Sequence, residues 1–99
     1  MANESVGLAQ YIRDVPDWPK KGILFRDITP LLANAGALQQ AVEAMCAPYE
    51  EMAIDFVAAV EARGFIFGTA VSERLVAGFV PIRKKGKLPY KTERVSYDL

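Results

Sequence analysis

The sequence contains no histidine and a single cysteine, and these absences exclude several kinds of site. Without an imidazole there is no His general base, no His–carboxylate triad and no His metal ligand. Cys46 lies on the apolar side of a helical pattern, so we expect a reduced core residue. Disulfide chemistry and metal chemistry are therefore not expected, and the predicted metal-ligand set is empty.

The chain also lacks a net charge and a long hydrophobic run. Twelve Lys and Arg balance twelve Asp and Glu, which argues against a general nucleic-acid or membrane-surface protein. No run is long enough to span a bilayer, and the N-terminus has no apolar core of the signal-peptide type. We therefore expect a cytoplasmic protein with no nucleic-acid or membrane partner. Its 99 residues, 52% hydrophobic, make one small domain or part of a larger one.

The balanced charge is unevenly distributed. Residues 83–94 hold six Lys or Arg against one Glu, whereas the charged residues of 43–61 are all acidic. This asymmetry indicates a local anionic ligand, although a solvated basic face is the simpler interpretation of such a string.

Hydrophobic periodicity and turn residues predict the elements of an α/β fold. A strand over 55–60, a helix over 65–77 and a strand over 79–84 form a βαβ unit, which normally has parallel strands. Residues 86–99 are predicted to form a loop or hairpin. Before the βαβ unit we expect a helix over 5–13, a brief extended piece at 23–25, a short helix capped by Thr29 with Pro30, and a helix over 37–52 interrupted at Pro48.

The loop Glu61–Gly64 leads from the first strand of this unit into its helix. Main-chain N–H groups at a helix start attract anions, and the guanidinium of Arg63 can donate to two phosphate oxygens. The glycines of a P-loop or a dinucleotide fingerprint are missing, and most strand–loop–helix corners bind nothing. The second basic loop, residues 83–87, makes an anion site more credible.

Three segments, in order, resemble adenine phosphoribosyltransferases of the type I phosphoribosyltransferase family. They are residues 17–32 (DWPKKGILFRDITPLL), 60–68 (VEARGFIFG) and 80–89 (VPIRKKGKLP), with Tyr97-Asp98-Leu99 continuing in register. The resemblance implies transfer of a 5-phosphoribosyl group from phosphoribosyl pyrophosphate (PRPP) to adenine, which yields AMP and pyrophosphate with Mg²⁺. Mg²⁺ would arrive with PRPP rather than on the residues identified here. The resemblance also implies a homodimer.

Carried over by position, the first segment would bind adenine. Leu24 would hold the base edge with its main chain, Phe25 would pack on the ring, and Arg26 would donate to a ring nitrogen. Main-chain donors and acceptors can reject the wrong base, because it leaves buried polar groups unpaired. Without the resemblance, Phe25 is better interpreted as a core residue.

The other two segments would bind PRPP and pyrophosphate through Glu61, Ala62, Arg63, Gly64, Arg83, Lys84 and Lys87. Arg63 and Lys87 would stabilise the charge on the leaving pyrophosphate. Related enzymes bend the first of these loops with a cis peptide bond, which here would join Glu61 to Ala62.

The resemblance implies a partial doubly wound parallel sheet with an N-terminal helical hood. Residues 1–34 would form the hood and base-binding segment, and 35–99 the first part of the core, incomplete at its C-terminus. No Asp-Asp-x-x-x-Thr-Gly-Gly-Thr motif for ribose 5-phosphate occurs in the sequence. We therefore expect part of a longer enzyme, with little activity alone. A truncated inactive fragment, or a non-catalytic regulatory or dimerisation module of the same fold, remains the alternative.

Overall fold

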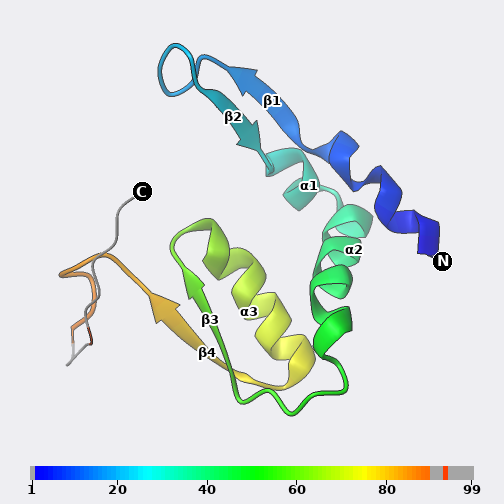
Figure 1. Ribbon diagram of the computed structural model, residues 1–99, viewed down its shortest axis with the longest axis vertical. Coiled ribbons are helices and arrows are strands. Elements are labelled where there is room, and N and C mark those ends of the chain that lie inside the picture. The colour runs from blue at the N-terminus through cyan, green and yellow to red at the C-terminus, as the bar shows by residue number, and fades with distance from the viewer. Residues whose placement is uncertain (1, 90–92, 94–99) are drawn as a thin grey trace. The chain divides into compact units, whose positions relative to one another are not determined.

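The computed structural model describes residues 2–89 and 93, with side chains from residue 7 onward. The chain divides into two compact units, Met1–Glu51 and Met52–Leu99. Figure 1 labels the elements in chain order. The predicted boundary between residues 34 and 35 differs from this division, because helix α2 packs against the elements that precede it.

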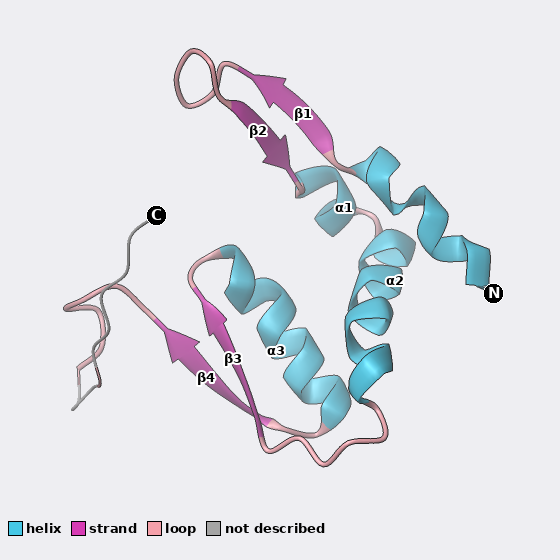
Figure 2. Cartoon of the chain, viewed as in Figure 1, coloured by secondary structure: helices cyan, strands magenta, loops and turns pink. Residues whose placement is uncertain are grey.

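The first unit contains a β-hairpin (Figure 2). Strands β1 (Arg13–Pro16) and β2 (Leu24–Asp27) pair antiparallel, with Arg13 opposite Asp27 and Pro16 opposite Leu24. Opposite charges face each other across this ladder, a pairing that favours the register. The predicted hood is therefore mixed rather than helical, since the extended piece at 23–25 finds a partner strand.

The helices of the first unit build its core. They are η1 (Ala2–Tyr11), a 3₁₀ helix, α1 (Thr29–Ala33), α2 (Ala35–Cys46) and the short 3₁₀ helix η2 (Ala47–Tyr49). Helices α1 and α2 contact each other, and both contact η1. The buried apolar side chains belong to Leu31, Ala37, Ala41, Val42 and Cys46.

The helix ends follow local chemistry, with two corrections. Asn34 ends α1 and caps α2, where its side chain accepts from the N–H of Ala37 at 2.9 Å. Helix α2 stops at Cys46 rather than 52, and Pro48 lies in η2. Thr29 is the first residue of α1 rather than its cap, which is Ile28, and the N–H of Thr29 donates to Asp27 at 2.9 Å.

A third correction concerns the N-terminal segment. The helix predicted over 5–13 ends at Tyr11 as a 3₁₀ helix, and Arg13 opens strand β1 instead. The cause is non-local, since Arg13 is held opposite Asp27 by the hairpin.

The second unit is the predicted βαβ unit. Strands β3 (Phe56–Val60) and β4 (Gly78–Ile82) pair in parallel, with Phe56 opposite Gly78 and Val60 opposite Ile82. Helix α3 (Arg63–Leu75) connects them and contacts both strands (Figure 1). The α/β fold class is thereby confirmed, with helix and strand boundaries within a few residues of those predicted.

Close packing joins α3 to the sheet. The rings of Phe65 and Phe79 meet edge to face with centroids 5.8 Å apart. Gly68 lies directly over the strands, since a Cβ built on it would approach the Phe79 ring to 2.6 Å and the Ala59 Cβ to 2.8 Å. Glycine at this position lets the helix approach the sheet closely.

One expectation falls largely outside the described residues. Of the loop or hairpin predicted over 86–99, only residues 86–89 and 93 are described. Within the described part of the chain, no helix combines the length and apolarity needed to cross a membrane.

Candidate anion-binding corner and base-binding hairpin

The corner between β3 and α3 is shorter than predicted. Helix α3 begins at Arg63, so Arg63 and Gly64 form its first turn and only Glu61 and Ala62 lie in the loop. The peptide bond between Glu61 and Ala62 is cis, as the resemblance implies. Arg63 is exposed, and the first main-chain N–H groups of a 13-residue helix lie beside it. This arrangement suits an anion.

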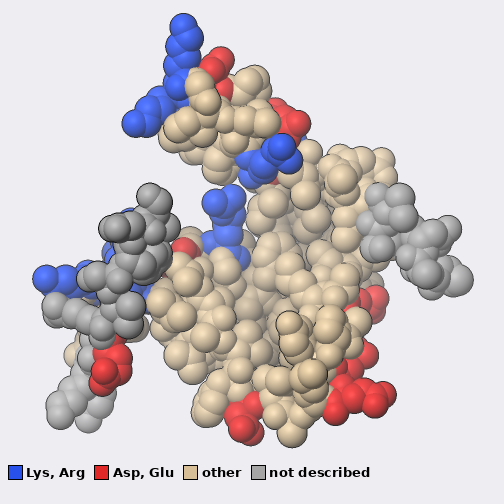
Figure 3. Space-filling model, viewed as in Figure 1, with Lys and Arg blue, Asp and Glu red and all other residues tan. Residues whose placement is uncertain are grey.

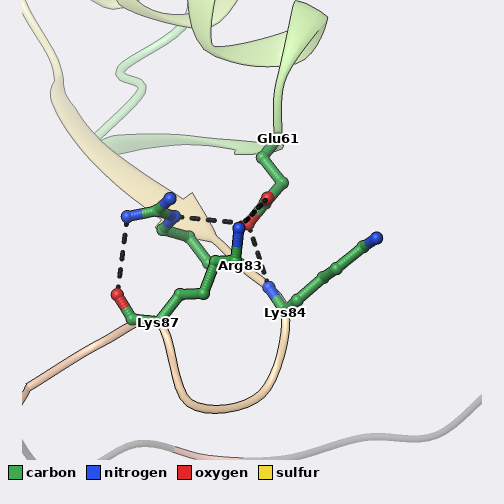
Figure 4. Close-up of polar contacts among 4 residues, drawn as sticks. All are labelled: Glu61, Arg83, Lys84 and Lys87. Carbon is green, nitrogen blue, oxygen red and sulfur yellow. Dashed lines mark hydrogen bonds and ion pairs between the residues drawn. The ribbon is translucent and has the colours of Figure 1, made fainter.

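The carboxylate of Glu61 joins this corner to the residues that follow β4 (Figure 4). We call residues 83–87 the basic turn. Glu61 Oε1 accepts from the main-chain N–H of Lys84 at 3.0 Å and from Arg83 Nε at 3.2 Å. Glu61 Oε2 lies 3.8 Å from Lys87 Nζ. The N–H of Glu61 in turn donates to the carbonyl of Ile82 at 3.1 Å.

These donors keep Glu61 ionised. The N–H of Lys84 has the largest effect in lowering the pKa of the Glu61 carboxyl below its ordinary value, and the hydrogen bond and charge of Arg83 and the charge of Lys87 add to it. Partial desolvation opposes these effects without reversing them. Glu61 is therefore an anion at neutral pH.

The basic turn has its own internal bonds. Gly86 has a φ of +87°, which glycine adopts without strain, and the N–H of Lys87 donates to the carbonyl of Lys84 at 3.1 Å. The Arg83 guanidinium donates to the carbonyl of Lys87 at 3.4 Å and lies 5.9 Å from the Phe65 ring centroid. Figure 3 shows Lys and Arg side chains gathered near the end of β4.

The predicted base-binding residues lie on strand β2. Leu24 is 48% exposed, and its cross-strand partner Pro16 has no N–H to donate to it. Phe25 meets the ring of Trp18 edge to face, with centroids 4.6 Å apart. Arg26 Nε pairs with Asp14 Oδ1 at 3.2 Å, and both side chains are exposed, so the pair itself adds only about 0–1 kcal/mol to stability.

Asp27 organises the end of this hairpin, a role that the sequence analysis missed. Its Oδ1 accepts from the hydroxyl and the N–H of Thr29 at 2.6 and 2.9 Å. Its Oδ2 lies 3.0 and 3.2 Å from two nitrogens of Arg13. The spacing Asp-x-Thr before a helix was the available signal, since Asp accepts from N–H groups two residues on.

Asp27→Asn should weaken the fold of the first unit most at neutral pH. The Thr29 hydrogen bonds, chiefly that of its hydroxyl, lower the pKa of Asp27 below its ordinary value of 3.8. A lowered folded-state pKa contributes stability above the ordinary value and loses it as the pH falls through the folded-state value. Thermal unfolding between about pH 2 and 7 should therefore show the wild-type and variant curves converging below pH 3.8.

Asp14→Asn is the matched control, because Asp14 makes one exposed ion pair on the neighbouring strand. It should alter the unfolding curve less than Asp27→Asn. Equal pH profiles for the wild type and Asp27→Asn would contradict the role assigned to Asp27.

The sequence analysis also did not predict the hydrogen bonds and ion pairs of the Glu61 side chain. The resemblance treats Glu61 as part of a loop around pyrophosphate, whereas its carboxylate is turned to the basic turn. The register of the parallel pair, with Val60 opposite Ile82, brings residues 61 and 83 side by side. This register is a feature of the folded βαβ unit, so the sequence alone did not predict the pair.

No protein-family model matches the chain. A curated relative from Rhodopirellula baltica, named adenine phosphoribosyltransferase, is 57% identical over 96 residues, which are 97% of this chain and 47% of the relative. The crystal structure of adenine phosphoribosyltransferase from Rhodothermus marinus has a TM-score of 0.86 and 49% identity, covering 94% of this chain and 53% of that one. The Saccharomyces cerevisiae enzyme has a TM-score of 0.85 and 37% identity, covering 92% and 56%.

The sequence and the fold of this chain are thus similar to those of phosphoribosyltransferases. In sequence and fold, the chain matches about half of an adenine phosphoribosyltransferase. It spans about half the length of the curated relatives that it matches.

Proposed function

We propose that residues 1–99 are part of an enzyme that transfers the 5-phosphoribosyl group of PRPP to adenine, in purine salvage. The bond between C1 of the ribose and the pyrophosphate oxygen breaks, pyrophosphate leaves with that electron pair, and a bond from C1 to N9 of adenine forms as the N9 proton is released to solvent. The observation that carries this proposal is the meeting of the α3 N-terminus and the basic turn at one end of the β3–β4 pair. Two cationic segments there suit a diphosphate leaving group.

In this reaction, the corner between β3 and α3 would stabilise the negative charge of the leaving group. Negative charge grows on the departing phosphates as the ribose becomes oxocarbenium-like, and Arg63 and Lys87 are the proposed catalytic residues that stabilise it. Ala62, Gly64, Arg83 and Lys84 complete the proposed pyrophosphate site with Glu61. Arg63 is exposed at the start of α3, as contact with a ligand requires.

The hairpin is the proposed adenine site. The main-chain edge of Leu24 would read the amino-substituted edge of the base, with Phe25 against the ring and Arg26 on a ring nitrogen. Base–aromatic stacking contributes about 1–3 kcal/mol per base. The related yeast enzyme was crystallised with adenine, which supports this ligand for the present chain.

Three further features belong to the same proposal. Mg²⁺ would enter bound to PRPP as part of the substrate, and within residues 2–89 and 93 no group of three or more Cys, Asp or Glu is arranged to hold a metal ion. The enzyme would be a cytoplasmic homodimer. Sedimentation of the complete protein tests the dimer.

Arg26→Ala should weaken adenine and AMP binding by about tenfold or more, since a hydrogen bond from a charged donor is lost. Isothermal titration calorimetry on the complete protein that contains residues 1–99 measures the change. Arg13→Ala is the matched control, because Arg13 is also an exposed arginine in an ion pair of this hairpin. It should bind adenine like the wild type.

Two results would contradict the proposal. One is adenine binding that is unchanged in Arg26→Ala. The other is binding of a short DNA duplex with a steep salt dependence, which would instead indicate a nucleic-acid protein.

A further inference from the structure

The candidate anion-binding site contains one acidic residue, Glu61. Glu61 lies between the α3 N-terminus and the basic turn, and its side chain is only 15% exposed. Its negative charge opposes the approach of a diphosphate. A carboxylate that repels the ligand should therefore contribute to the site in another way, and the hydrogen bonds of Glu61 indicate how.

Glu61 holds the main chain of the basic turn, and it does not pair with every cationic side chain of that turn. The shortest bond runs to the N–H of Lys84, at 3.0 Å, and the next to Arg83 Nε, at 3.2 Å. The Lys84 ammonium group extends away from Glu61 (Figure 4). Among the residues that the structure describes, that ammonium group makes no ion pair.

Further hydrogen bonds link the residues that Glu61 contacts to the rest of the turn. Arg83, held by Glu61, donates to the carbonyl of Lys87 at 3.4 Å, and Lys87 returns a bond from its N–H to the carbonyl of Lys84. Glu61 itself is held to β4 through the carbonyl of Ile82. One carboxylate thus connects the β3–α3 corner to both ends of the basic turn.

We propose that Glu61 is a positioning residue, which holds the basic turn against the β3–α3 corner so that the Lys84 ammonium group is directed to the diphosphate. The inference rests on the proposed function. Glu61 neutralises part of the charge of Arg83, which then acts mainly in shaping the turn, whereas Lys87 Nζ, 3.8 Å from Glu61 Oε2, keeps its proposed role at the leaving group. Because Arg63, Arg83, Lys84 and Lys87 outnumber it, the site keeps a positive charge.

Two substitutions separate charge from hydrogen bonding. Glu61→Gln keeps an oxygen that can accept from the N–H of Lys84 but loses the ion pairs, whereas Glu61→Ala loses both. Glu73→Gln is the matched control, since it makes the same chemical change on the exposed surface of α3. All are made in the complete protein that contains residues 1–99.

Two readouts apply to each variant: amide hydrogen exchange at Lys84, and steady-state KM for PRPP beside kcat. In Glu61→Ala we expect faster exchange at Lys84 and a KM raised about tenfold, the effect of losing hydrogen bonds to a charged group, with a smaller change in kcat. Glu61→Gln should fall between Glu61→Ala and the wild type. Glu73→Gln should match the wild type in both readouts.

Tighter PRPP binding in Glu61→Gln or Glu61→Ala would overturn the inference, because Glu61 would then be a competing counter-ion. Unchanged exchange and unchanged KM in both variants would overturn it as well, and would leave the proposed function standing. Absence of PRPP binding by the unmodified protein would overturn the proposed function and this inference together.

Discussion

Arg63→Ala should lower kcat/KM of the complete protein by about 10²–10³, the range seen when one preorganised donor to a developing negative charge is removed. Arg63 begins helix α3, so the chain carries its guanidinium fork at the helix N-terminus, where the helix dipole also favours an anion. The loss should be concentrated in kcat, because the charge on pyrophosphate grows as the bond to the ribose breaks. Steady-state kinetics with varied PRPP at saturating adenine measures it.

Arg63→Lys and Arg74→Ala are the controls for this prediction. Lysine keeps the charge but cannot donate to two oxygens in a fixed fork, so Arg63→Lys should recover only part of the activity. Arg74 is an exposed arginine in the last turn of the same helix, and Arg74→Ala should retain the wild-type rate. Equal rates for Arg63→Ala and Arg74→Ala would contradict an electrostatic role for Arg63.

Gly68→Ala should destabilise the second unit by about 1–3 kcal/mol, the usual cost of overpacking a close contact. Its new methyl group would stand 2.8 Å from the Cβ of Ala59 and 2.6 Å from the Phe79 ring. The Phe79 ring can rotate away, but the Cβ of Ala59 moves only with its strand. Alanine favours a helix over glycine by roughly 0.5–1 kcal/mol, which offsets part of this loss. Chemical denaturation measures the net change.

Thr69→Ala is the control for Gly68→Ala. Thr69 is the next residue of α3, and it is exposed with its hydroxyl donating to the carbonyl of Phe65. Its replacement should alter the free energy of unfolding by no more than about 0.5 kcal/mol, as is usual on a surface. A Gly68→Ala protein as stable as the wild type would show that α3 can move off the sheet without cost.

The βαβ unit was predictable because its signals are local. Phe56–Val60 is a short apolar run and Gly78–Ile82 another, separated by a helical pattern of suitable length. The parallel pairing followed from that order alone. The hairpin was not predictable in the same way, since Arg13 joins a strand only when Asp27 stands opposite it. Residues 5–13 have a helical pattern locally, and a contact from a distant part of the sequence overrides it.

In the candidate site, too, the local features could be predicted from the sequence and the contacts between distant residues could not. The basic residues at 83–87 and the arginine at 63 were visible from charge and from resemblance, and their functional roles stay predictions. Glu61 was recognised as part of the loop but not as its connection to the basic turn. Charge pairing between residues 22 positions apart depends on which strands are neighbours, and that information arises only when the βαβ unit closes.

Amino-acid order alone was enough to exclude histidine chemistry, to establish an α/β segment similar to phosphoribosyltransferases, and to locate two cationic loops. Only the tertiary structure showed that helix α2 packs with the elements before it and that the N-terminal unit contains a hairpin. It also showed which donors surround the carboxylates of Asp27 and Glu61. The physical reason is distance along the chain. Propensity and periodicity act over a few residues, whereas hydrogen bonds and ion pairs between remote residues require the backbone to bring them within about 3 Å.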